Sequence, residues 1–305
     1  MTNWTTADIP AQRGRIAVVT GTGGIGFEVA LALSRAGAEI ILAGRNPTKG
    51  AEAVAAIHQV VPSARVRFEA VDLASLASVA AFADRIAGQT DRLDLLVNNA
   101  GVMRPPRRMT TDDGFEIQLG VNYLSHFALT GRLLPLLLKG EGARVVTLSS
   151  VAARQGAINF DDLQAERAYR SMHVYAQSKL ACLMFAFELQ RRAEANGWPL
   201  SSLAAHPGLS KTSLLENAPG GGGRVAPIYR MVRALLMQTP AQGALPALYA
   251  ATAAQASPGG YYGPDRAGET RGHPAPSRIP TAARDFAAAR LLWEVSEDLT
   301  GVRYG

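Results

Sequence analysis

Short apolar runs alternate with longer segments of helical periodicity through the first two-thirds of this 305-residue chain. This alternation is typical of repeated strand–helix–strand units, in which consecutive strands lie parallel and helices cover the sheet. Most of the runs are nearly unbroken Val, Ile, Leu and Ala, as expected of strands buried on both faces. The sequence therefore predicts an α/β fold: a single-domain Rossmann fold with a doubly wound parallel sheet and helices on both faces.

The predicted strands and helices follow one another in a regular order. Strands are predicted at 16–20, 39–44, 66–71, 93–98, 144–149 and 200–206. Helices are predicted at 27–36, 47–60, 75–88, 113–138, 173–196, 241–253 and 282–299. No shift in composition divides the chain, so residues 1–305 are expected to form one domain.

Three segments are expected to lie outside this regular pattern. They are an N-terminal extension at 1–13, a substrate lid region at about 209–240 and a C-terminal extension at about 257–305. Within the lid region, the Gly-rich stretch 218–223 fits a flexible lid and a surface loop equally well. The Gly- and Pro-rich stretch 257–280 is expected to be a long ordered loop.

A glycine-rich stretch, TGTGGIG (residues 20–26), joins the first predicted strand to the first predicted helix. Small residues at such a turn let the backbone approach a pyrophosphate, whose charge the free N–H groups of the helix N-terminus attract. In this context the stretch predicts a dinucleotide-binding site. The residues predicted to contact the cofactor here are Gly21, Thr22, Gly24, Ile25 and Gly26.

The end of the second predicted strand distinguishes between two nicotinamide cofactors. NAD-binding proteins usually have an Asp or Glu there, which holds the ribose 2′-hydroxyl. This chain has no acid at that place and instead has Arg45, whose planar guanidinium suits a 2′-phosphate. We therefore expect NADP(H) as the cofactor, with NAD(H) as the less favoured alternative.

Four further motifs follow in order: LVNNAG (96–101), VVTLSS (145–150), YAQSK (175–179) and HPG (206–208). Together with residues 20–26 they resemble the short-chain dehydrogenase/reductase family, over a span from about residue 14 to at least residue 212. Within that family the chain is most similar to the retinol-dehydrogenase-like group, on segments 27–50 and 121–130. Its C-terminal segment (GGYYGP to LTGV) resembles bacterial members of this group, which carry no membrane anchor.

The resemblance implies roles for individual residues. Asn122, Ser150, Tyr175 and Lys179 match the catalytic residues of the family, in which the asparagine holds a water in a proton relay. Ser149, beside Ser150, is left out of this set. Further cofactor contacts are implied for Asp72, Leu73, Asn98, Ala100, Gly101, Tyr175, Lys179, Pro207, Gly208 and Thr212.

Relative to the family pattern, the glycine-rich stretch is one residue short. We align Gly21, Gly24 and Gly26 with the family glycines, so that Thr22 and Gly23 span what three residues span in other members. Gly23 is expected to adopt a positive φ, which glycine tolerates, so that this tighter turn can close.

The implied catalytic residues suit hydride transfer between a carbonyl and an alcohol. The phenol of a tyrosine ionises at about pH 10 in water, so acid–base work near neutrality needs a nearby positive charge. Lys179 lies four residues after Tyr175, on the same helix face. Ser150 would hydrogen-bond the substrate oxygen, where negative charge grows during hydride transfer.

We therefore expect an NADP(H)-dependent oxidoreductase that interconverts an aldehyde or ketone and an alcohol on a small, lipophilic substrate. Two alternatives remain. An epimerase or dehydratase of the extended branch of the family would need glycine where this chain has Phe27. A non-catalytic NADP(H)-sensing protein would usually lack the Tyr175–Lys179 pair.

Composition argues against several other classes. The chain carries a net charge of +6, but its basic residues are scattered and follow no zinc-finger or aromatic–basic spacing, so nucleic acid is not an expected partner. The five histidines show no metal-ligand spacing, and no metal is expected. With no apolar run of about 18 residues, no secretory signal and only one cysteine, Cys182, we expect a cytoplasmic protein. The family resemblance implies a homodimer or homotetramer that pairs through the helix carrying Tyr175.

Overall fold

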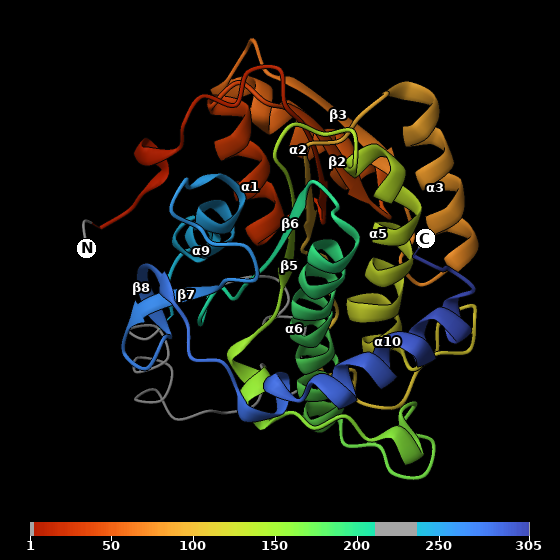
Figure 1. Ribbon diagram of the computed structural model, residues 1–305. Coiled ribbons are helices and arrows are strands. Elements are labelled where there is room, and N and C mark those ends of the chain that lie inside the picture. The colour runs from red at the N-terminus through yellow and green to blue at the C-terminus, as the bar shows by residue number, and fades with distance from the viewer. Residues whose placement is uncertain (1–2, 211–236, 305) are drawn as a thin grey trace.

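The computed structural model of the chain, in which residues 3–210 and 237–304 are described, is built around one eight-stranded sheet (Figure 1). The order of the strands is β3-β2-β1-β4-β5-β6-β7-β8, and all neighbouring pairs are parallel except β7 with β8. The strands are β1 (Ile16–Thr20), β2 (Glu39–Gly44), β3 (Arg65–Ala70), β4 (Leu95–Asn98), β5 (Ala143–Leu148), β6 (Leu200–Ala205), β7 (Tyr261–Arg266) and β8 (Arg271–Pro276). The predicted doubly wound α/β fold is confirmed.

Helices cover both faces of this sheet. They are α1 (Gly24–Arg35), α2 (Pro47–Val60), α3 (Leu76–Gln89), α4 (Ile117–Leu119), α5 (Ser125–Leu137), α6 (Ser171–Asn196), α9 (Pro240–Thr252) and α10 (Phe286–Thr300). Single helical turns lie at η1 (Thr6–Asp8), η2 (Gly120–Leu124), η3 (Val151–Gln155), η4 (Phe160–Asp162) and η5 (Thr281–Arg284).

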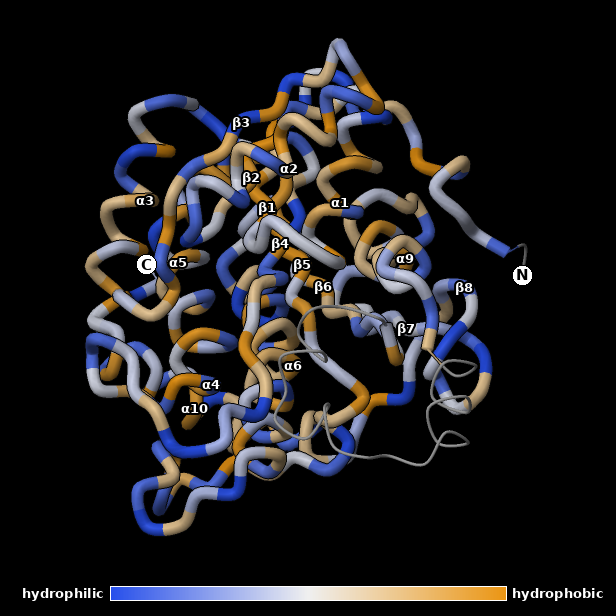
Figure 2. The backbone as a smooth tube through the Cα atoms, turned by 180° about the vertical axis from the view of Figure 1, so that it is seen from behind, coloured by the Kyte–Doolittle hydropathy of each residue, from blue (hydrophilic) through white to orange (hydrophobic). Residues whose placement is uncertain are grey.

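Two hydrophobic cores form because successive side chains of a strand point to opposite faces. Val18 of β1 packs with residues of α3, α5, α6 and α10, while Val19 packs with residues of α1, α2 and α9. Both side chains are fully buried. In the hydropathy colouring of Figure 2 the central strands are predominantly orange, as expected of a sheet that has a core on each face.

The C-terminal helix α10 covers the outer side of α6 and reaches α5 (Figure 1). Its Trp293 is 1% exposed, stacks on Phe185 of α6 and meets Phe127 of α5 edge-on, with centroid distances of 5.7 and 5.0 Å. The Arg192 guanidinium lies 4.4 Å from the centre of a Trp293 ring. These contacts hold α6, which also carries Tyr175 and Lys179, against the sheet.

The predicted helix at 113–138 is wrong in its first four residues, 113–116. The chain forms a turn at 111–114 and an isolated bridge between Thr110 and Glu116 before α4 begins at Ile117. The buried Glu116 carboxylate accepts hydrogen bonds from the Gln118 and Leu119 backbone amides, 2.8 Å each, and so caps α4. A π-helical turn, η2, then joins α4 to α5.

The stretch 257–280, predicted to be an ordered loop, instead contributes β7 and β8 to the sheet. Other predicted helix starts also differ. The first helix begins at Gly24, three residues before the predicted 27, and the last begins at Phe286 after the short turn η5.

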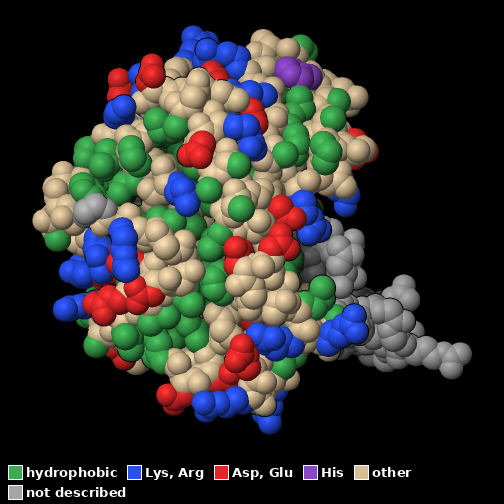
Figure 3. Space-filling model, turned by 90° about the vertical axis from the view of Figure 1, so that its right-hand side faces the viewer, with side chains coloured by type: hydrophobic (Ala, Val, Ile, Leu, Met, Phe, Trp, Pro, Cys, Tyr) green, Lys and Arg blue, Asp and Glu red, His purple; other side chains and the backbone are tan. Residues whose placement is uncertain are grey.

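Charged side chains are mixed in sign on the face shown in Figure 3, where Lys and Arg lie among Asp and Glu. Within residues 3–210 and 237–304, no helix is both long and apolar enough to cross a membrane. In the same residues, no three His, Cys, Asp or Glu side chains lie close enough together to hold a metal ion.

Candidate active site

A cavity of about 490 Å³ opens at the carboxyl ends of the central strands, where ligands bind in open α/β sheets. It is bordered by α1, by the segments that follow β4, β5 and β6, by α6, and by the turn between β7 and β8. The residues around it include Ile25, Asn99, Ser150, Tyr175, Lys179, Pro207, Gly208, Gly268 and Thr270. Residues from six parts of the chain that are far apart in sequence thus meet at one site.

Tyr175 and Lys179 lie one turn apart near the start of α6, and both border the cavity. Each is only 5% exposed. The Lys179 ammonium donates a hydrogen bond to the Leu148 carbonyl at the end of β5, at 2.9 Å. The Lys179 side chain is thereby held at the cavity, one helical turn from Tyr175.

Ser149 and Ser150 both border the cavity, but their hydroxyl groups make different contacts. Ser150 is the N-cap of η3, and its hydroxyl accepts a hydrogen bond from the Ala152 amide at 3.2 Å. The buried Ser149 hydroxyl donates to the Lys179 carbonyl at 2.7 Å. This geometry favours Ser150 over Ser149 as the residue that meets a substrate.

Asn122 lies in the π-helical turn η2, buried behind the cavity. Its side chain accepts from the Val102 amide at 2.7 Å and donates to the Val102 carbonyl and the Ser178 hydroxyl at 3.0 and 2.9 Å. Gly101 packs closely here, because a Cβ atom on it would lie 2.9 Å from the Asn122 Oδ1. Asn122 therefore connects the segment after β4 to α6. π-helical turns of this kind are frequent at functional sites.

The glycine-rich turn closes differently from the prediction. Gly21 and Gly24 adopt positive φ values of 97° and 54°, while Gly23 has an extended backbone with φ −134°, so the prediction for Gly23 is wrong. A Cβ atom on Gly26 would overlap the backbone oxygen of Gly21. Gly26 therefore requires glycine for steric reasons, Gly21 requires it because of its positive φ and the close Asn99 side chain, and space is open beside Gly23.

Thr20, at the end of β1, connects this turn to the segment after β4. Its hydroxyl accepts from the Asn99 and Ala100 amides at 2.9 and 3.0 Å and lies 2.9 Å from the His126 Nε2. The Asn99 side chain donates to the Thr20 carbonyl at 2.7 Å. The side chain of Asn98, at the end of β4, donates instead to the Thr130 hydroxyl at 3.0 Å.

His126 was missed by the sequence analysis, which considered histidines only as metal ligands. Burial lowers its pKa to about 4, so the ring is neutral near pH 7. Because the Asn122 carbonyl can only accept, Nδ1 carries the proton and donates to it at 3.0 Å, and the unprotonated Nε2 accepts from the Thr20 hydroxyl. The available sequence signal was the position of His126 four residues after Asn122, which brings the two onto one helix face.

The other end of the predicted cofactor site lies beyond β2. The Arg45 side chain is 75% exposed and lies 3.9 Å from the Asp72 carboxylate. That carboxylate also accepts from the Ala74 amide at 2.9 Å, which fixes the turn after β3. Leu73, which lies between Asp72 and Ala74 in the sequence, is buried in the core. Arg45 is therefore exposed at the surface and only weakly paired.

Pro207 and Gly208, which are predicted to contact the cofactor, border the cavity after β6. Gly208 has φ +61°, and a Cβ atom on it would overlap the Thr270 carbonyl. The remaining predicted cofactor contact, Thr212, lies outside the part of the chain that the structure describes, as does most of the predicted lid at 209–240.

Comparison with known families decides the classification. The profile of the short chain dehydrogenase family matches residues 15–220. The chain belongs to this family.

Its relatives within the family include named dehydrogenases. It is 41% identical to the polyprenol dehydrogenase of Mus musculus (97% of this chain and 87% of that protein) and 39% identical to the human retinol dehydrogenase 13 (95% and 85%). Among solved structures, an uncharacterised protein of Mycobacterium paratuberculosis has a TM-score of 0.82 at 38% identity, with both chains fully covered. A short chain dehydrogenase of Shigella flexneri complexed with NADP has a TM-score of 0.65 at 26% identity, covering 83% and 98% of the chains. The protein is an oxidoreductase of the retinol-dehydrogenase-like group.

The short-chain dehydrogenase site of this chain fits a nicotinamide dinucleotide. The N-cap of α1 is Gly23, which offers no side-chain cap, so the first N–H groups of the helix remain available for an anion. The Thr22 side chain packs so closely on β2 that a Cβ atom on Gly44 would lie 2.9 Å from its methyl group. This close approach places the turn directly beside Arg45.

Proposed function

We propose that this short-chain dehydrogenase interconverts an aldehyde or ketone and an alcohol on a small, lipophilic substrate, using NADP(H). The observation that carries the proposal is the single cavity bordered by Ser150, Tyr175, Lys179 and the Pro207–Gly208 segment. A hydrogen-bond donor, an acid–base group and a buried cation therefore face the same space.

In this proposal each residue performs one task. NADPH, when bound, supplies the hydride for the carbonyl carbon. The Tyr175 hydroxyl gives a proton to the carbonyl oxygen in reduction and accepts one from the alcohol in oxidation. The Lys179 ammonium places its positive charge at the same cavity, one helical turn along α6 from that tyrosine. The Ser150 hydroxyl donates a hydrogen bond to the substrate oxygen, on which negative charge develops.

Asn122 is proposed to support the reaction by positioning. Its side chain ties Val102 to Ser178, and Ser178 immediately precedes Lys179. Its backbone carbonyl accepts from the His126 Nδ1 and the Cys182 thiol at 3.0 and 3.1 Å. A proton relay through a water held by Asn122, implied by the family resemblance, stays a prediction.

The preference for NADP(H) is supported by Arg45. It is the residue after β2, it is exposed, and its nearest carboxylate is 3.9 Å away. A guanidinium in this state can pair with a 2′-phosphate in a two-pronged contact. The NADP complex of the related Shigella flexneri dehydrogenase supports the same choice.

A lipophilic substrate is supported by the walls of the cavity and by the relatives. Met103, Val151, Ala152, Met172 and Leu209 provide an apolar lining. Two relatives are named as dehydrogenases of retinol and polyprenol, which are long apolar alcohols. A cytoplasmic location and pairing into a homodimer or homotetramer stay predictions from the sequence.

The experiment that tests the proposal follows loss of NADPH with the purified protein and a panel of carbonyl compounds. Medium-chain and retinoid aldehydes should be reduced, and polar sugars of similar size should react far more slowly. NADH at equal concentration should support a slower reaction. Failure of every carbonyl, with either cofactor, would overturn the proposal.

A further inference from the structure

The turn between β7 and β8 has an unfavourable backbone conformation. Ala267 and Glu269 both lie in the left-handed region, with φ of 50° and 68°, and Gly268 between them has φ of 69°. Residues other than glycine, asparagine and aspartate rarely adopt such φ values. A backbone conformation of this kind persists where surrounding contacts require it. Glu269 makes such contacts.

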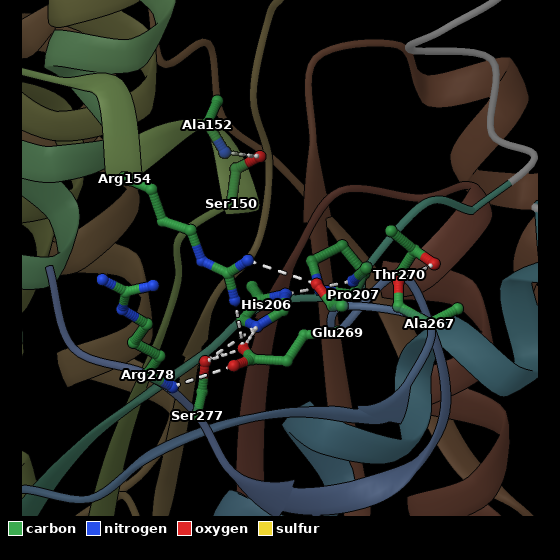
Figure 4. A network of polar contacts seen from close by, with 12 residues as sticks. Ser150, Ala152, Arg154, His206, Pro207, Ala267, Glu269, Thr270, Ser277 and Arg278 are labelled. Atoms are coloured by element: carbon green, nitrogen blue, oxygen red, sulfur yellow. Dashed lines mark hydrogen bonds and ion pairs between the residues drawn. The ribbon is translucent and has the colours of Figure 1, made fainter.

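The Glu269 carboxylate contacts three separate segments (Figure 4). Its Oε2 lies 2.5 Å from the Arg154 Nη2 and 3.0 Å from the His206 Nε2, and it accepts the hydroxyl proton of Ser277. Its Oε1 accepts from the Arg278 amide at 3.1 Å. Both carboxylate oxygens are thus used, and the glutamate joins η3 to the end of β6 and to the end of β8.

Two of these contacts lead directly to residues of the active site. Arg154 lies in η3, the helical turn that Ser150 caps, and its Nη1 also donates to the Gly268 carbonyl at 3.2 Å. His206 immediately precedes Pro207, and its Nδ1 accepts from the Gly208 amide at 3.2 Å. The Ser150 segment and the Pro207–Gly208 segment, two walls of the cavity, are therefore joined through one carboxylate.

The same turn makes a backbone contact with the second wall. The Thr270 carbonyl accepts from the Leu209 amide at 2.8 Å. Gly268 and Thr270 themselves border the cavity, as does Arg154. The turn is therefore part of the active site wall, although it lies more than 90 residues beyond Tyr175 in the sequence.

The charges in this network are consistent with a fixed arrangement. Hydrogen bonds from His206, Ser277 and the Arg278 amide, together with the Arg154 charge, overcome the effect of burial and lower the pKa of Glu269 to about 2. Burial lowers the pKa of His206, so a neutral His206 donates from Nε2 to an ionised Glu269. The carboxylate also offsets the positive charge of Arg154, which borders the cavity.

We propose that Glu269 is a positioning residue that holds the Ser150 segment and the Pro207–Gly208 segment at a fixed separation across the cavity. This proposal rests on the proposed function, in which Ser150 meets the substrate oxygen, and on the cofactor contacts that the family resemblance implies for Pro207 and Gly208. Glu269 touches neither reacting atom. Its removal should therefore lower kcat while the apolar walls, and with them KM, change little.

The test compares Glu269→Gln with Asp265→Asn, a matched control in the same hairpin. The Asp265 carboxylate accepts from the His273 amide at 2.9 Å and pairs with Arg266 at 3.8 Å, on contacts that involve neither Arg154 nor His206. Glu269→Gln keeps the size of the side chain, but it removes the negative charge that faces four donors and replaces one acceptor oxygen with an NH2 group. We expect its kcat to fall about 10- to 100-fold, the usual effect of a small misplacement of reacting groups, and the kcat of the control to stay within about twofold.

A second readout needs neither substrate nor cofactor. Hydrogen exchange of the free protein, measured by mass spectrometry, should become faster at 150–156 and 206–210 in Glu269→Gln and stay unchanged there in Asp265→Asn. If the wild-type protein reduces no carbonyl, the proposed function fails, and hydrogen exchange still tests the role of Glu269. The two failures are therefore distinguishable.

Arg154→Gln breaks the same ion pair from the other side and covers the case in which Glu269→Gln does not fold. It should also lower kcat, and the double variant should lose less than the product of the two single losses, because the Arg154–Glu269 ion pair is lost in all three. Wild-type kcat and wild-type exchange in Glu269→Gln or Arg154→Gln would overturn the proposal. So would an equal loss of kcat in Asp265→Asn.

Discussion

The backbone oxygen of Gly21 occupies the space into which a Cβ atom on Gly26 would project. The first turn of α1 thus packs directly on the end of β1, and the helix N-terminus comes close to the expected position of the cofactor pyrophosphate. This contact between Gly21 and Gly26 gives the chain the strand–turn–helix arrangement of the short-chain dehydrogenases, although its turn is one residue short.

Gly26→Ala should therefore damage both the fold and cofactor binding, whereas Gly23→Ala should not. Overpacking at position 26 is expected to cost about 1–3 kcal/mol of unfolding free energy. Gly23 has ordinary φ and open space beside it, so its change should stay within about 0.5 kcal/mol. Urea unfolding and titration with NADPH measure both effects. Equal behaviour of the two variants would contradict the geometry of the turn.

Arg45→Ala should weaken NADP(H) far more than NAD(H). Loss of a charged hydrogen bond to the 2′-phosphate corresponds to about 1.5–3 kcal/mol, or roughly 10- to 100-fold in Kd. The matched control is Arg65→Ala, an exposed arginine at the start of β3, at the opposite ends of the strands from the cavity. Calorimetric titration with each cofactor checks the prediction. A similar loss for NADP and NAD would place Arg45 outside the phosphate site.

The core of the fold could be predicted because its strands are locally apolar. Runs such as 16–20 and 39–44 match β1 and β2, since a strand buried on both faces needs no partner information to be recognised. β7 and β8 could not be found this way. Pro264, Pro274 and Pro276 interrupt their pattern, and proline usually indicates a loop.

The sheet tolerates these prolines for a positional reason. β8 is an edge strand, so Pro274 and Pro276 need not donate hydrogen bonds to a further strand. β7 pairs with β6 only at Tyr261 and Tyr262, which leaves Pro264 beyond that ladder. Information of this kind exists only after the strand order is known.

The site shows the same division between local and distant information. Tyr175 and Lys179 are one helical turn apart, so their spacing predicts that they meet. Glu269 lies 63 residues from His206 and 115 from Arg154, and no local pattern connects them. Only the topology, which places the β7–β8 turn beside the ends of β5 and β6, brings these residues together.

The aromatic cluster under α10 should dominate the stability of the α6 face. Trp293→Ala removes a side chain that is 1% exposed and contacts Phe127, Phe185 and Tyr304, with an expected loss of about 3–5 kcal/mol. Phe286→Ala, on the same helix but 69% exposed, should change stability by less than about 0.5 kcal/mol. Urea unfolding measures both. A loss below about 1 kcal/mol for Trp293→Ala would contradict the packing of α10 on α6.

Stability should fall in mildly acidic solution because of His126. Its pKa is lowered from 6.5 to about 4 in the folded state, mainly by burial and partly by the Lys179 charge. The unfolded chain therefore binds a proton first, and stability present above pH 6.5 is lost as the pH falls from about 6.5 to about 4, by up to about 1.4 kcal/mol per pH unit. His206, whose pKa burial also lowers, adds in the same direction.

His126→Gln should remove part of this dependence. Unfolding free energies measured at several values between pH 7.5 and pH 4.5 should fall less steeply for the variant than for the wild type, whatever its stability at pH 7.5. Parallel curves for the two proteins would show that His126 takes up its proton equally in the folded and unfolded states.

The most direct measurement of the central claim is the reaction rate of Tyr175→Phe. The change removes only the hydroxyl that the account assigns to proton transfer, and Tyr249→Phe on α9 is the control for the loss of a phenol elsewhere. With an apolar aldehyde and NADPH, Tyr175→Phe should lose about 100-fold or more in kcat, bind NADPH with unchanged affinity, and fold normally, while the control reacts like the wild type. A Tyr175→Phe protein that reduces the aldehyde at the wild-type rate would contradict the account.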